Sequence, residues 1–397
     1  MKKKLFRRVL SAVCRGSVWT IVHRLRFIAF SASVLVFFTH PATALEDVLE
    51  TPAMETDLAT QSLLLDITLA GTTYVAVGER GHIIYSEDGG KTWAQGVVPV
   101  STTLTAVYFV DSRHGWAVGH GGIVLHTSDA GKTWIKQLDG HLANQMVIQA
   151  ARLQVEKLEA RLDAAPEEGK VDIEYELEEA QYNLEDAIAD AETGASKPLL
   201  DVWFKDVNNG FAVGAYGFFF KTSDGGKTWE NRAHQIKNPD RFHLNAIDKI
   251  AGDALFMVGE AGIAYVSMDF GETWQSLDVP YDGSFFGLTG TGNVNELLVF
   301  GLRGHVFRSV DLGQSWKRID SGTDASLTGG SYGKNNNVTL VGLRGVVAVS
   351  NDSGESFISI ERKDRQALSA VIQKTDQTLL LFGENGVVNS DSKGKNL

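Results

Sequence analysis

A glycine-bracketed quartet, Gly-x-x-Gly, recurs along this chain. The copies are Gly78–Gly81, Gly119–Gly122, Gly214–Gly217, Gly259–Gly262, Gly301–Gly304, Gly342–Gly345 and Gly383–Gly386. The first glycines of successive copies are 41, 95, 45, 42, 41 and 41 residues apart. A period of about 40 to 45 residues with strand-like patterning is typical of a β-propeller. The sequence therefore predicts an all-β fold, a seven-bladed β-propeller with one insertion.

A second motif follows the quartets. It is an Asp-box, S/T-x-D-x-G-x-T/S-W/F, found at Ser86–Trp93, Thr127–Trp134, Thr222–Trp229, Ser267–Trp274, Ser309–Trp316 and Ser350–Phe357. Its aspartate is expected to accept backbone N–H bonds within the turn between the third and fourth strands, and its aromatic residue to become buried between sheets. We interpret the aspartates as structural: Asp88, Asp129, Asp224, Asp269, Asp311 and Asp352.

Composition excludes several kinds of site. The formal net charge of −12 argues against a nucleic-acid binder, which relies on clustered Lys and Arg. The single cysteine, Cys14, allows neither a disulfide framework nor a cysteine metal site. We expect a monomer that needs no metal and no cofactor.

The first 44 residues have the pattern of an export signal. Basic residues precede an apolar run from Phe27 to Phe38, which is short for a membrane span, and Ala42-Thr43-Ala44 forms a small-x-small cleavage pattern. We expect a periplasmic or secreted protein with residues 1–44 removed. An uncleaved membrane anchor is the alternative.

The seventh blade lacks part of its repeat. Its Asp-box begins at Ser390, and the chain ends at Leu397 before an aromatic residue or a fourth strand. An unpaired sheet edge would be exposed there. We therefore expect residues of about 46 to 56 to close blade 7, within a first propeller segment of residues 45–140 that holds blades 1 and 2.

The long spacing holds a helical insertion at residues 141–197. Apolar residues recur at steps of three and four on both sides of Pro166, which predicts an antiparallel helical hairpin of coiled-coil type. The segment has 14 acidic and 5 basic residues. It is interpreted either as a solvated acidic surface or as a docking arm for a basic or membrane-associated partner. Blades 3 to 7 are then expected in residues 198–397.

The quartets and the hairpin should share one face, opposite the Asp-box turns. The third positions of the quartets place Arg303, Arg344, Asn385 and Arg80 in one arc over blades 5, 6, 7 and 1, with Tyr216 in blade 3. Such an arc suits an anionic group or an acidic protein segment. The alternative is a set of exposed arginines partly paired with Glu79 and Glu384.

Two aspartates occupy equivalent positions on the inner strands, Asp66 and Asp201. Facing one channel, they offer an acid/base pair for glycoside cleavage, which is the alternative function. A sialidase would also need an Arg-Ile-Pro motif, and the chain has none.

The run from Tyr74 to Trp93, which joins a strand, a quartet, a strand and an Asp-box, resembles the photosystem II stability/assembly factor family. The likeness covers roughly residues 60 to 390 without the insertion. It implies an exported, non-enzymatic propeller that holds a membrane-protein subunit or membrane-complex subunit during maturation. It also implies an arginine patch, for which Arg80, Arg303 and Arg344 are the available positions. The acidic hairpin and the Gram-negative type of signal depart from the photosynthetic members, so photosynthesis is only a family label here.

Overall fold

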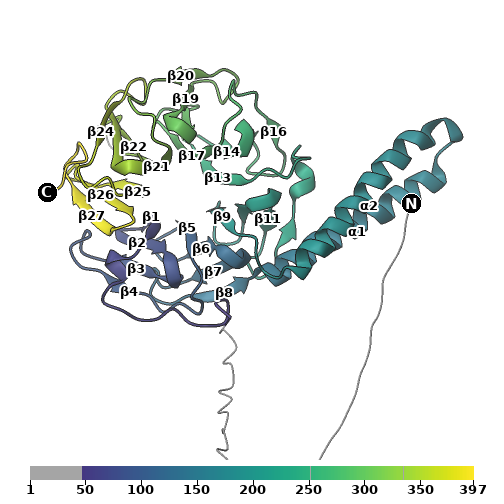
Figure 1. Cartoon of the computed structure of the whole chain (residues 1–397), viewed down its shortest axis with the longest axis horizontal. Coiled ribbons are helices and arrows are strands. Elements are labelled where there is room, and N and C mark those ends of the chain that lie inside the picture. Colours follow the sequence, from purple (N-terminus) through teal and green to yellow (C-terminus); the bar gives the residue numbers. More distant parts are fainter. Residues whose placement is uncertain (1–46, 251, 334) are drawn as a thin grey trace, which may run out of the picture. The chain divides into compact units, whose positions relative to one another are not determined.

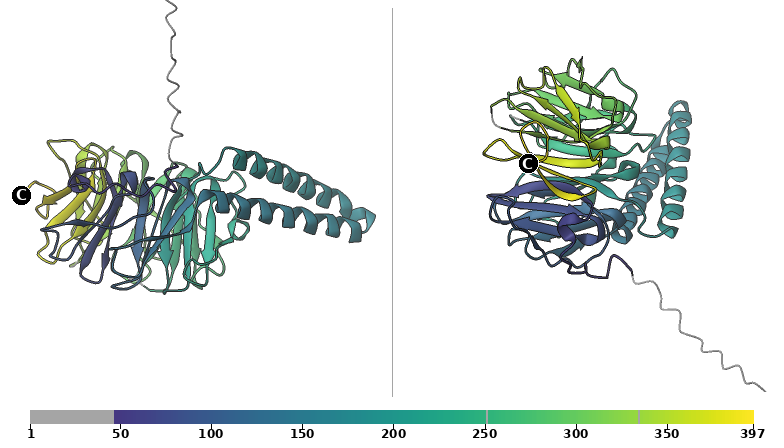
Figure 2. Two further views of the ribbon diagram at one scale, coloured as in Figure 1. Left: turned by 90° about the horizontal axis from the view of Figure 1, so that it is seen from below. Right: turned by 60° about the vertical axis from the view of Figure 1, so that its left-hand side comes forward.

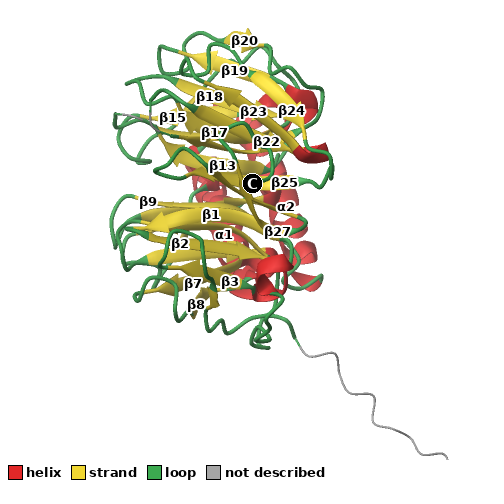
Figure 3. Ribbon diagram, turned by 90° about the vertical axis from the view of Figure 1, so that its left-hand side faces the viewer, coloured by secondary structure: helices red, strands yellow, loops and turns green. Residues whose placement is uncertain are grey.

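The computed structural model describes residues 47–250, 252–333 and 335–397. The expected export signal lies outside these residues. Seven antiparallel sheets follow one another around a ring, as the quartets predict (Figure 1). Within each sheet the strands pair in chain order from the inner strand outward (Figure 3).

The strands of blades 1 to 4 are β1 Leu64–Ala70, β2 Thr73–Gly78, β3 Ile83–Ser86, β4 Ala94–Gln95, β5 Leu104–Phe109, β6 Gly115–Gly119, β7 Ile123–Thr127, β8 Ile135–Leu138, β9 Leu199–Phe204, β10 Gly210–Gly214, β11 Phe219–Thr222, β12 Glu230–Asn231, β13 Leu244–Lys249, β14 Leu255–Gly259, β15 Ala264–Ser267 and β16 Gln275–Ser276. Those of blades 5 to 7 are β17 Phe285–Gly290, β18 Leu297–Gly301, β19 Val306–Ser309, β20 Lys317–Ile319, β21 Leu327–Tyr332, β22 Val338–Gly342, β23 Val346–Ser350, β24 Ile358–Glu361, β25 Leu368–Gln373, β26 Leu379–Gly383 and β27 Gly386–Ser390.

The core lies between neighbouring blades. The second strand of every blade is buried along its whole length, because both of its faces pack against adjacent sheets. The aromatic residues of the Asp-boxes contribute to these layers. Trp93 of blade 1 packs edge-on against Phe382 of blade 7 at 6.0 Å between ring centroids, and Trp274 of blade 4 against Phe211 of blade 3 at 6.2 Å.

The Asp-box turns have the local geometry that the sequence predicts. In blade 3, Asp224 Oδ1 accepts from the backbone N–H of Thr228 at 2.9 Å, and Asp224 Oδ2 accepts from the Thr228 hydroxyl at 2.7 Å. These two bonds hold the pKa of Asp224 below its usual range, since they stabilise the ionised carboxylate. The carboxylate is therefore occupied in fixing its own turn.

Side chains join the inner strands of successive blades. Four of them donate to the carbonyl of the first residue of the next inner strand: Thr105 Oγ1 to Leu199 O at 2.8 Å, Asn245 Nδ2 to Phe285 O at 2.7 Å, Thr328 Oγ1 to Leu368 O at 2.6 Å and Ser369 Oγ to Leu64 O at 2.7 Å. These bonds connect blades 2 to 3, 4 to 5, 6 to 7 and 7 to 1.

Blades 1 and 3 have leucine at that position, and the aspartate that follows it takes over the connection. Asp66 Oδ2 accepts from Val107 N of blade 2, and Asp201 Oδ2 accepts from Ile247 N of blade 4, both at 2.8 Å. We call these six contacts the inter-blade hydrogen bonds. In the described residues they connect neighbouring blades at six of the seven blade-to-blade junctions. Asp66 and Asp201 thus perform a structural task.

Blade 7 differs from the expectation that residues 46–56 close it. Its sheet has three strands, and residues 46–56 do not supply a fourth in the described part of the chain. This segment instead lies along blades 1 and 2, where Ala53 N donates to Val98 O at 3.0 Å and Ser101 N donates to Val48 O at 2.9 Å. Asn396 pairs with Ser390 in a single antiparallel bridge, so the chain's own last residues cover part of the edge.

The ring closes without that fourth strand. The 3-10 helix η1, Ala59–Gln61, contacts β27, and Ala59 is buried in one cluster with Leu380 and Phe382. Ser369 adds its hydrogen bond to Leu64 O, which lies on β1. Residues just after the expected closing segment therefore join the two ends, mainly through side-chain packing.

The insertion is a helical hairpin. Helix α1, Gly140–Ala164, and helix α2, Lys170–Glu192, pack on each other and are joined by the 3-10 helix η4, Glu167–Gly169. Both helices extend away from the ring (Figure 2). Asp139 caps α1 by accepting from His141 N and Leu142 N, both at 3.1 Å. None of the helices among the described residues is long and apolar enough to cross a membrane.

Replacing Ser369 with alanine tests ring closure. We expect the free energy of unfolding to fall by about 1–3 kcal/mol, because the buried carbonyl of Leu64 loses its donor. Chemical denaturation followed by tryptophan fluorescence measures the loss. Ser392→Ala removes an exposed hydroxyl from the end of the same blade and should change stability by less than about 0.5 kcal/mol. Equal losses in both variants would contradict a closing role for Ser369.

A third aspartate of the inner strands, Asp248 on β13, gives a prediction on pH. Burial raises the pKa of Asp248 to about 6. Burial, with a smaller contribution from the charge of Asp248, raises the pKa of Asp66 to about 7, against the hydrogen bonds from Val107 N and Ile67 N, which lower it. Because the folded state holds these protons more tightly than the unfolded state, in which aspartates titrate at about pH 4, stability is lost as pH rises from about 4 to about 7. Asp248→Asn keeps the oxygen that accepts from Lys249 N at 2.7 Å and removes the charge.

We expect Asp248→Asn to lie within about 0.5 kcal/mol of the wild type near pH 4 and to be more stable by about 1–3 kcal/mol at pH 8. Denaturant titrations at each pH measure the difference. Asp240→Asn, at an exposed position that precedes the same blade, is the control and should show no such trend. A variant less stable than the wild type at pH 8 would refute the buried-charge account.

Candidate binding face of the propeller

The glycine quartets form tight turns between the second and third strands. In blades 1 to 6 each turn is a 3-10 helix: η2 Glu79–Gly81, η3 His120–Gly122, η5 Ala215–Gly217, η7 Glu260–Gly262, η8 Leu302–Gly304 and η9 Leu343–Gly345. Because β3 and its counterparts run between a quartet and an Asp-box, the two motifs lie at opposite ends of the blades. Helix α1 contacts η3, so the hairpin begins on the quartet side. We call this side the quartet face.

The first glycine of a quartet is required by close packing. A Cβ atom on Gly78 would lie 2.0 Å from the carbonyl oxygen of Leu63, which no rearrangement of side chains can relieve. The third position adopts a left-handed conformation, with φ of 55° at Arg80, 56° at Arg303 and 61° at Arg344. Left-handed backbone costs about 1–2 kcal/mol for a residue with a Cβ. The fold therefore holds these three arginines at fixed, unfavourable turn positions.

The glutamates of the quartets do not pair with the arginines. Glu79 Oε1 accepts from Leu63 N at 3.2 Å, and Glu384 Oε2 accepts from Ala367 N at 3.0 Å. Glu260 in blade 4 does the same for His243 N at 3.3 Å. These carboxylates satisfy the backbone N–H groups just before the inner strands. Pairing of the arginines with Glu79 and Glu384, the alternative raised by the sequence, is thus wrong.

The three arginines have different surroundings. Arg344 forms ion pairs with Asp324 and with Glu361, the latter at 3.2 Å. Arg80 and Arg303 are exposed, and neither has an ion pair within the described residues. The arc expected over blades 5, 6, 7 and 1 therefore contains two available guanidinium groups, and its middle arginine is already neutralised.

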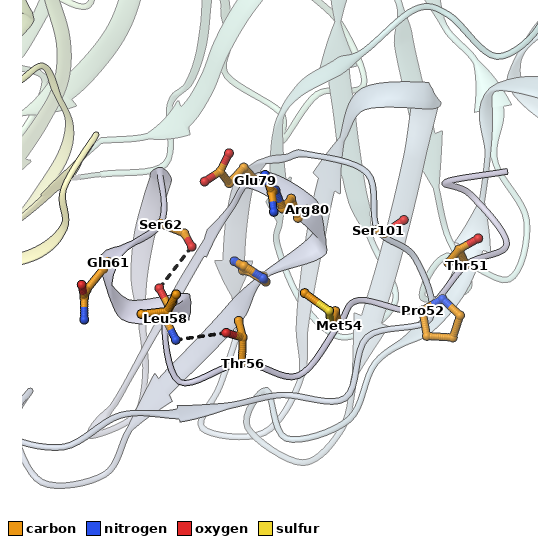
Figure 4. Close-up of a pocket in the computed structure, with 11 residues that line it drawn as sticks. Thr51, Pro52, Met54, Thr56, Leu58, Gln61, Ser62, Glu79, Arg80 and Ser101 are labelled. Atoms are coloured by element: carbon orange, nitrogen blue, oxygen red, sulfur yellow. Dashed lines mark hydrogen bonds between the residues drawn. The ribbon is translucent and has the colours of Figure 1, made fainter. Parts of the chain in front are cut away.

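Arg80 lies at a groove of about 670 Å³ on blade 1 (Figure 4). The chain segment before β1 forms one side of it, with Met54 and Leu58 largely exposed. Hydrogen bonds from Leu58 N to Thr56 Oγ1 at 3.2 Å and from Ser62 Oγ to Leu58 O at 3.2 Å shape this segment. The groove thus combines the free guanidinium of Arg80 with an apolar border, and Glu79, whose carboxylate accepts from Leu63 N, also lines it.

Arg303 belongs to a basic group that the sequence did not reveal. With His305 and Arg318 it lines a second groove of about 330 Å³, which also contains Asp320. Tyr281 packs edge-on against His305 at 4.8 Å between ring centroids. Burial lowers the pKa of His305, with Arg318 and Arg303 adding to the effect, so its imidazole is neutral near pH 7. The sequence contained one cue to this group, because His305 directly follows the quartet of blade 5.

Tyr216 and Asn385 lie apart from these grooves. Tyr216 is 55% exposed and packs edge-on against His243 at 5.0 Å, with Lys197 Nζ 5.4 Å from its ring centroid. It therefore lies at the base of the hairpin. Asn385 is exposed. It lies in the two-residue turn between β26 and β27, where the quartet of blade 7 forms no 3-10 helix. Neither residue contributes a charge to the arc.

Asp66 and Asp201 are not available as an acid/base pair, because both oxygens of each carboxylate already accept hydrogen bonds. Asp66 Oδ1 accepts from Ile67 N, and Asp201 Oδ1 accepts from Val202 N, both at 2.8 Å, in addition to the inter-blade bonds of their Oδ2 atoms. Neither residue lines the grooves at Arg80 or Arg303. Among the described residues there is also no group of three or more His, Cys, Asp or Glu side chains that could hold a metal ion.

Comparison with known families gives a match over most of the propeller. A family model described as photosynthesis system II assembly factor YCF48 matches residues 46–158 and 187–330. Among curated proteins, the photosystem II assembly lipoprotein Ycf48 of Synechococcus sp. (strain CC9902) is 33% identical over 105 residues, which is 26% of this chain and 31% of the relative. That of Prochlorococcus marinus (strain MIT 9312) is 45% identical over 49 residues, 12% of this chain and 14% of the relative. The chain thus aligns with about a third or less of these relatives' length.

Solved structures share the fold. A structure titled "YCF48 bound to D1 peptide" has a TM-score of 0.57 at 17% identity and covers 86% of this chain and 99% of its own. YCF48 from Cyanidioschyzon merolae has a TM-score of 0.55 at 14% identity, with coverage of 86% and 98%. The WD40 propeller domain of Doa1 also reaches 0.55, at 8% identity and coverage of 86% and 95%, so these likenesses show the fold alone. Since the family model matches well over half of the chain, this protein belongs to the YCF48 family of photosynthesis system II assembly factors.

Proposed function

We propose that this protein is an exported, non-enzymatic assembly scaffold whose quartet face captures an anionic segment of a membrane-protein subunit. The observation that carries the proposal is the pair of exposed arginines without ion partners in the described residues, Arg80 and Arg303, held on rigid turns of one face. Guanidinium groups bind carboxylates through paired N–H donors, and preformed turns reduce the entropy lost on binding.

Family membership supports the same function. The curated relatives are named photosystem II assembly lipoproteins, and one solved structure of the family is titled as bound to a D1 peptide. By analogy, the partner here is a subunit of a membrane complex, and the protein acts in the periplasm or outside the cell. The photosystem itself is not part of the proposal, because the matched regions of the curated relatives are short.

Two grooves offer places for such a segment. The groove at Arg80 has an apolar border formed by Met54 and Leu58, and the groove at Arg303 adds the guanidinium of Arg318. An extended acidic peptide with some apolar side chains suits both. We assign the main role in binding to Arg80 and Arg303, and a smaller one to Arg344, Asn385 and Tyr216.

Substitution of both free arginines tests this role. We expect Arg80→Ala/Arg303→Ala to weaken binding of a fluorescent acidic peptide by about tenfold or more at 0.1 M salt, because two charge-assisted contacts are lost. Fluorescence anisotropy gives the Kd. The matched control is Arg161→Ala/Arg365→Ala, which removes the same charge from exposed arginines that already pair with Glu176 and Glu361.

The control should change Kd by less than about threefold. Equal weakening in both double variants would mean that only net charge matters, and the proposed site would be wrong. Affinity capture from detergent-solubilised membranes extends the test. The wild type should retain one defined membrane-protein subunit, and the Arg80/Arg303 variant should lose it while the control keeps it.

A further inference from the structure

One side of helix α2 is exposed and packs neither on α1 nor on the propeller. On α2 the residues Val171, Tyr175, Glu178, Tyr182 and Glu185 follow one another at steps of four and three, which places them along one side of the helix. We call them the tyrosine–glutamate stripe. The residues that face α1 lie on the opposite side of the helix and include the buried Ala180 and Ala187.

The apolar part of the stripe is well exposed. The exposed fractions are 58% for Val171, 69% for Tyr175 and 61% for Tyr182. Within the described residues, neither tyrosine ring contacts another aromatic ring or a cation, and neither hydroxyl makes a hydrogen bond. Aromatic residues are enriched at the centres of protein interfaces, where they bury large surfaces at low entropic cost. Two tyrosines seven residues apart are spaced to contact a second helix laid along α2.

The carboxylates of the stripe are also without partners. Glu178 and Glu185 are exposed and have no ion pair in the part of the chain that the structure describes. Three other acids on α2 do have partners: Glu176 pairs with Arg161 at 2.7 Å, Asp186 with Arg241 at 3.0 Å, and Asp190 with Lys197. The remaining acids of α2 have no ion pair among the described residues, as is the case for Glu178 and Glu185. The acids that stabilise the hairpin are therefore distinct from those that the stripe presents.

The stripe is held in place from its base. Arg241, from the segment between blades 3 and 4, donates to Asn183 Oδ1 at 2.7 Å as well as pairing with Asp186. Asn144 Nδ2 donates to Gly194 O at 3.0 Å and joins the two helices where they leave the ring. A surface about 20 Å long is thus presented on a fixed helix.

We propose that the tyrosine–glutamate stripe docks a basic amphipathic helix of a partner protein. In that helix, apolar side chains would pack on Tyr175 and Tyr182, while Lys or Arg residues at seven-residue spacing would face Glu178 and Glu185. Charge complementarity selects this occupant. A second copy of the stripe would oppose glutamate with glutamate, and an anionic membrane surface would repel the carboxylates.

This surface is independent of the proposed function. The family model passes over residues 159–186, which include the stripe up to Glu185, so the stripe lies outside the part of the chain that defines the family. Its charge is also opposite to that of Arg80 and Arg303. The protein would therefore hold two partner segments of opposite charge at separate surfaces.

A synthetic peptide tests the proposal with the full chain. The probe is a fluorescent peptide of about 21 residues that forms a helix with leucines on one side and lysines at every seventh position. A peptide of the same composition with shuffled lysines is its comparison. We expect the wild type to bind the ordered peptide at least about fivefold more tightly than the shuffled one. Glu178→Lys/Glu185→Lys should weaken binding about tenfold or more, and Tyr175→Ala/Tyr182→Ala about fivefold.

The matched control is Glu156→Lys/Asp163→Lys, which reverses two exposed acids seven residues apart on α1. It should change Kd by less than about threefold. Equal weakening by the control, equal binding of the shuffled peptide, or full binding by the tyrosine variant would each overturn the proposal. Circular dichroism confirms that every variant is folded. Sedimentation that shows a dimer abolished by Tyr175→Ala/Tyr182→Ala would assign the stripe to a second copy and also overturn it.

Discussion

The inter-blade hydrogen bonds of the inner strands are the contacts on which this ring depends. Each sheet satisfies its own backbone groups, but its inner strand has one edge without a backbone partner. Here a hydroxyl, an amide or a carboxylate at one of two adjacent positions reaches the next blade. The same bond type joins the last blade to the first through Ser369, which allows closure even though blade 7 has only three strands in the described residues.

A partly buried carboxylate in such a bond is costly to ionise, because it is largely withdrawn from water. Asp66 and Asp201 connect blades as acceptors, and burial raises the pKa of both. In a cleft, the same combination would suggest a catalytic acid. Here each carboxylate oxygen already accepts a backbone N–H, so the raised pKa is explained by a structural position. The geometry of these two residues therefore argues against the alternative function without appeal to the family.

The two proposed surfaces differ in how the fold presents them. The arginines of the quartet face lie on strained turns, where the backbone fixes the point at which each side chain leaves the chain. The stripe on α2 sits on a regular helix, and its direction depends on the contacts of Arg241 and Asn144 near the ring. A scaffold that uses both could hold two segments of an assembling complex at once.

The sequence by itself determined the features that depend on short-range pattern. The quartets and Asp-boxes predicted seven blades, and the steps of three and four predicted the hairpin, because each motif encodes a local backbone conformation. The position of Arg80 and Arg303 on one face followed from the same repeat.

Only the tertiary structure decided which groups are free. The repeat cannot show that Asp324 and Glu361 neutralise Arg344, that Glu79 and Glu384 bond to backbone, or that Arg318 joins Arg303. It also led to a wrong path for residues 46–56, which lie along blades 1 and 2. These outcomes depend on contacts between residues far apart in the chain, and a local pattern carries no information about such contacts.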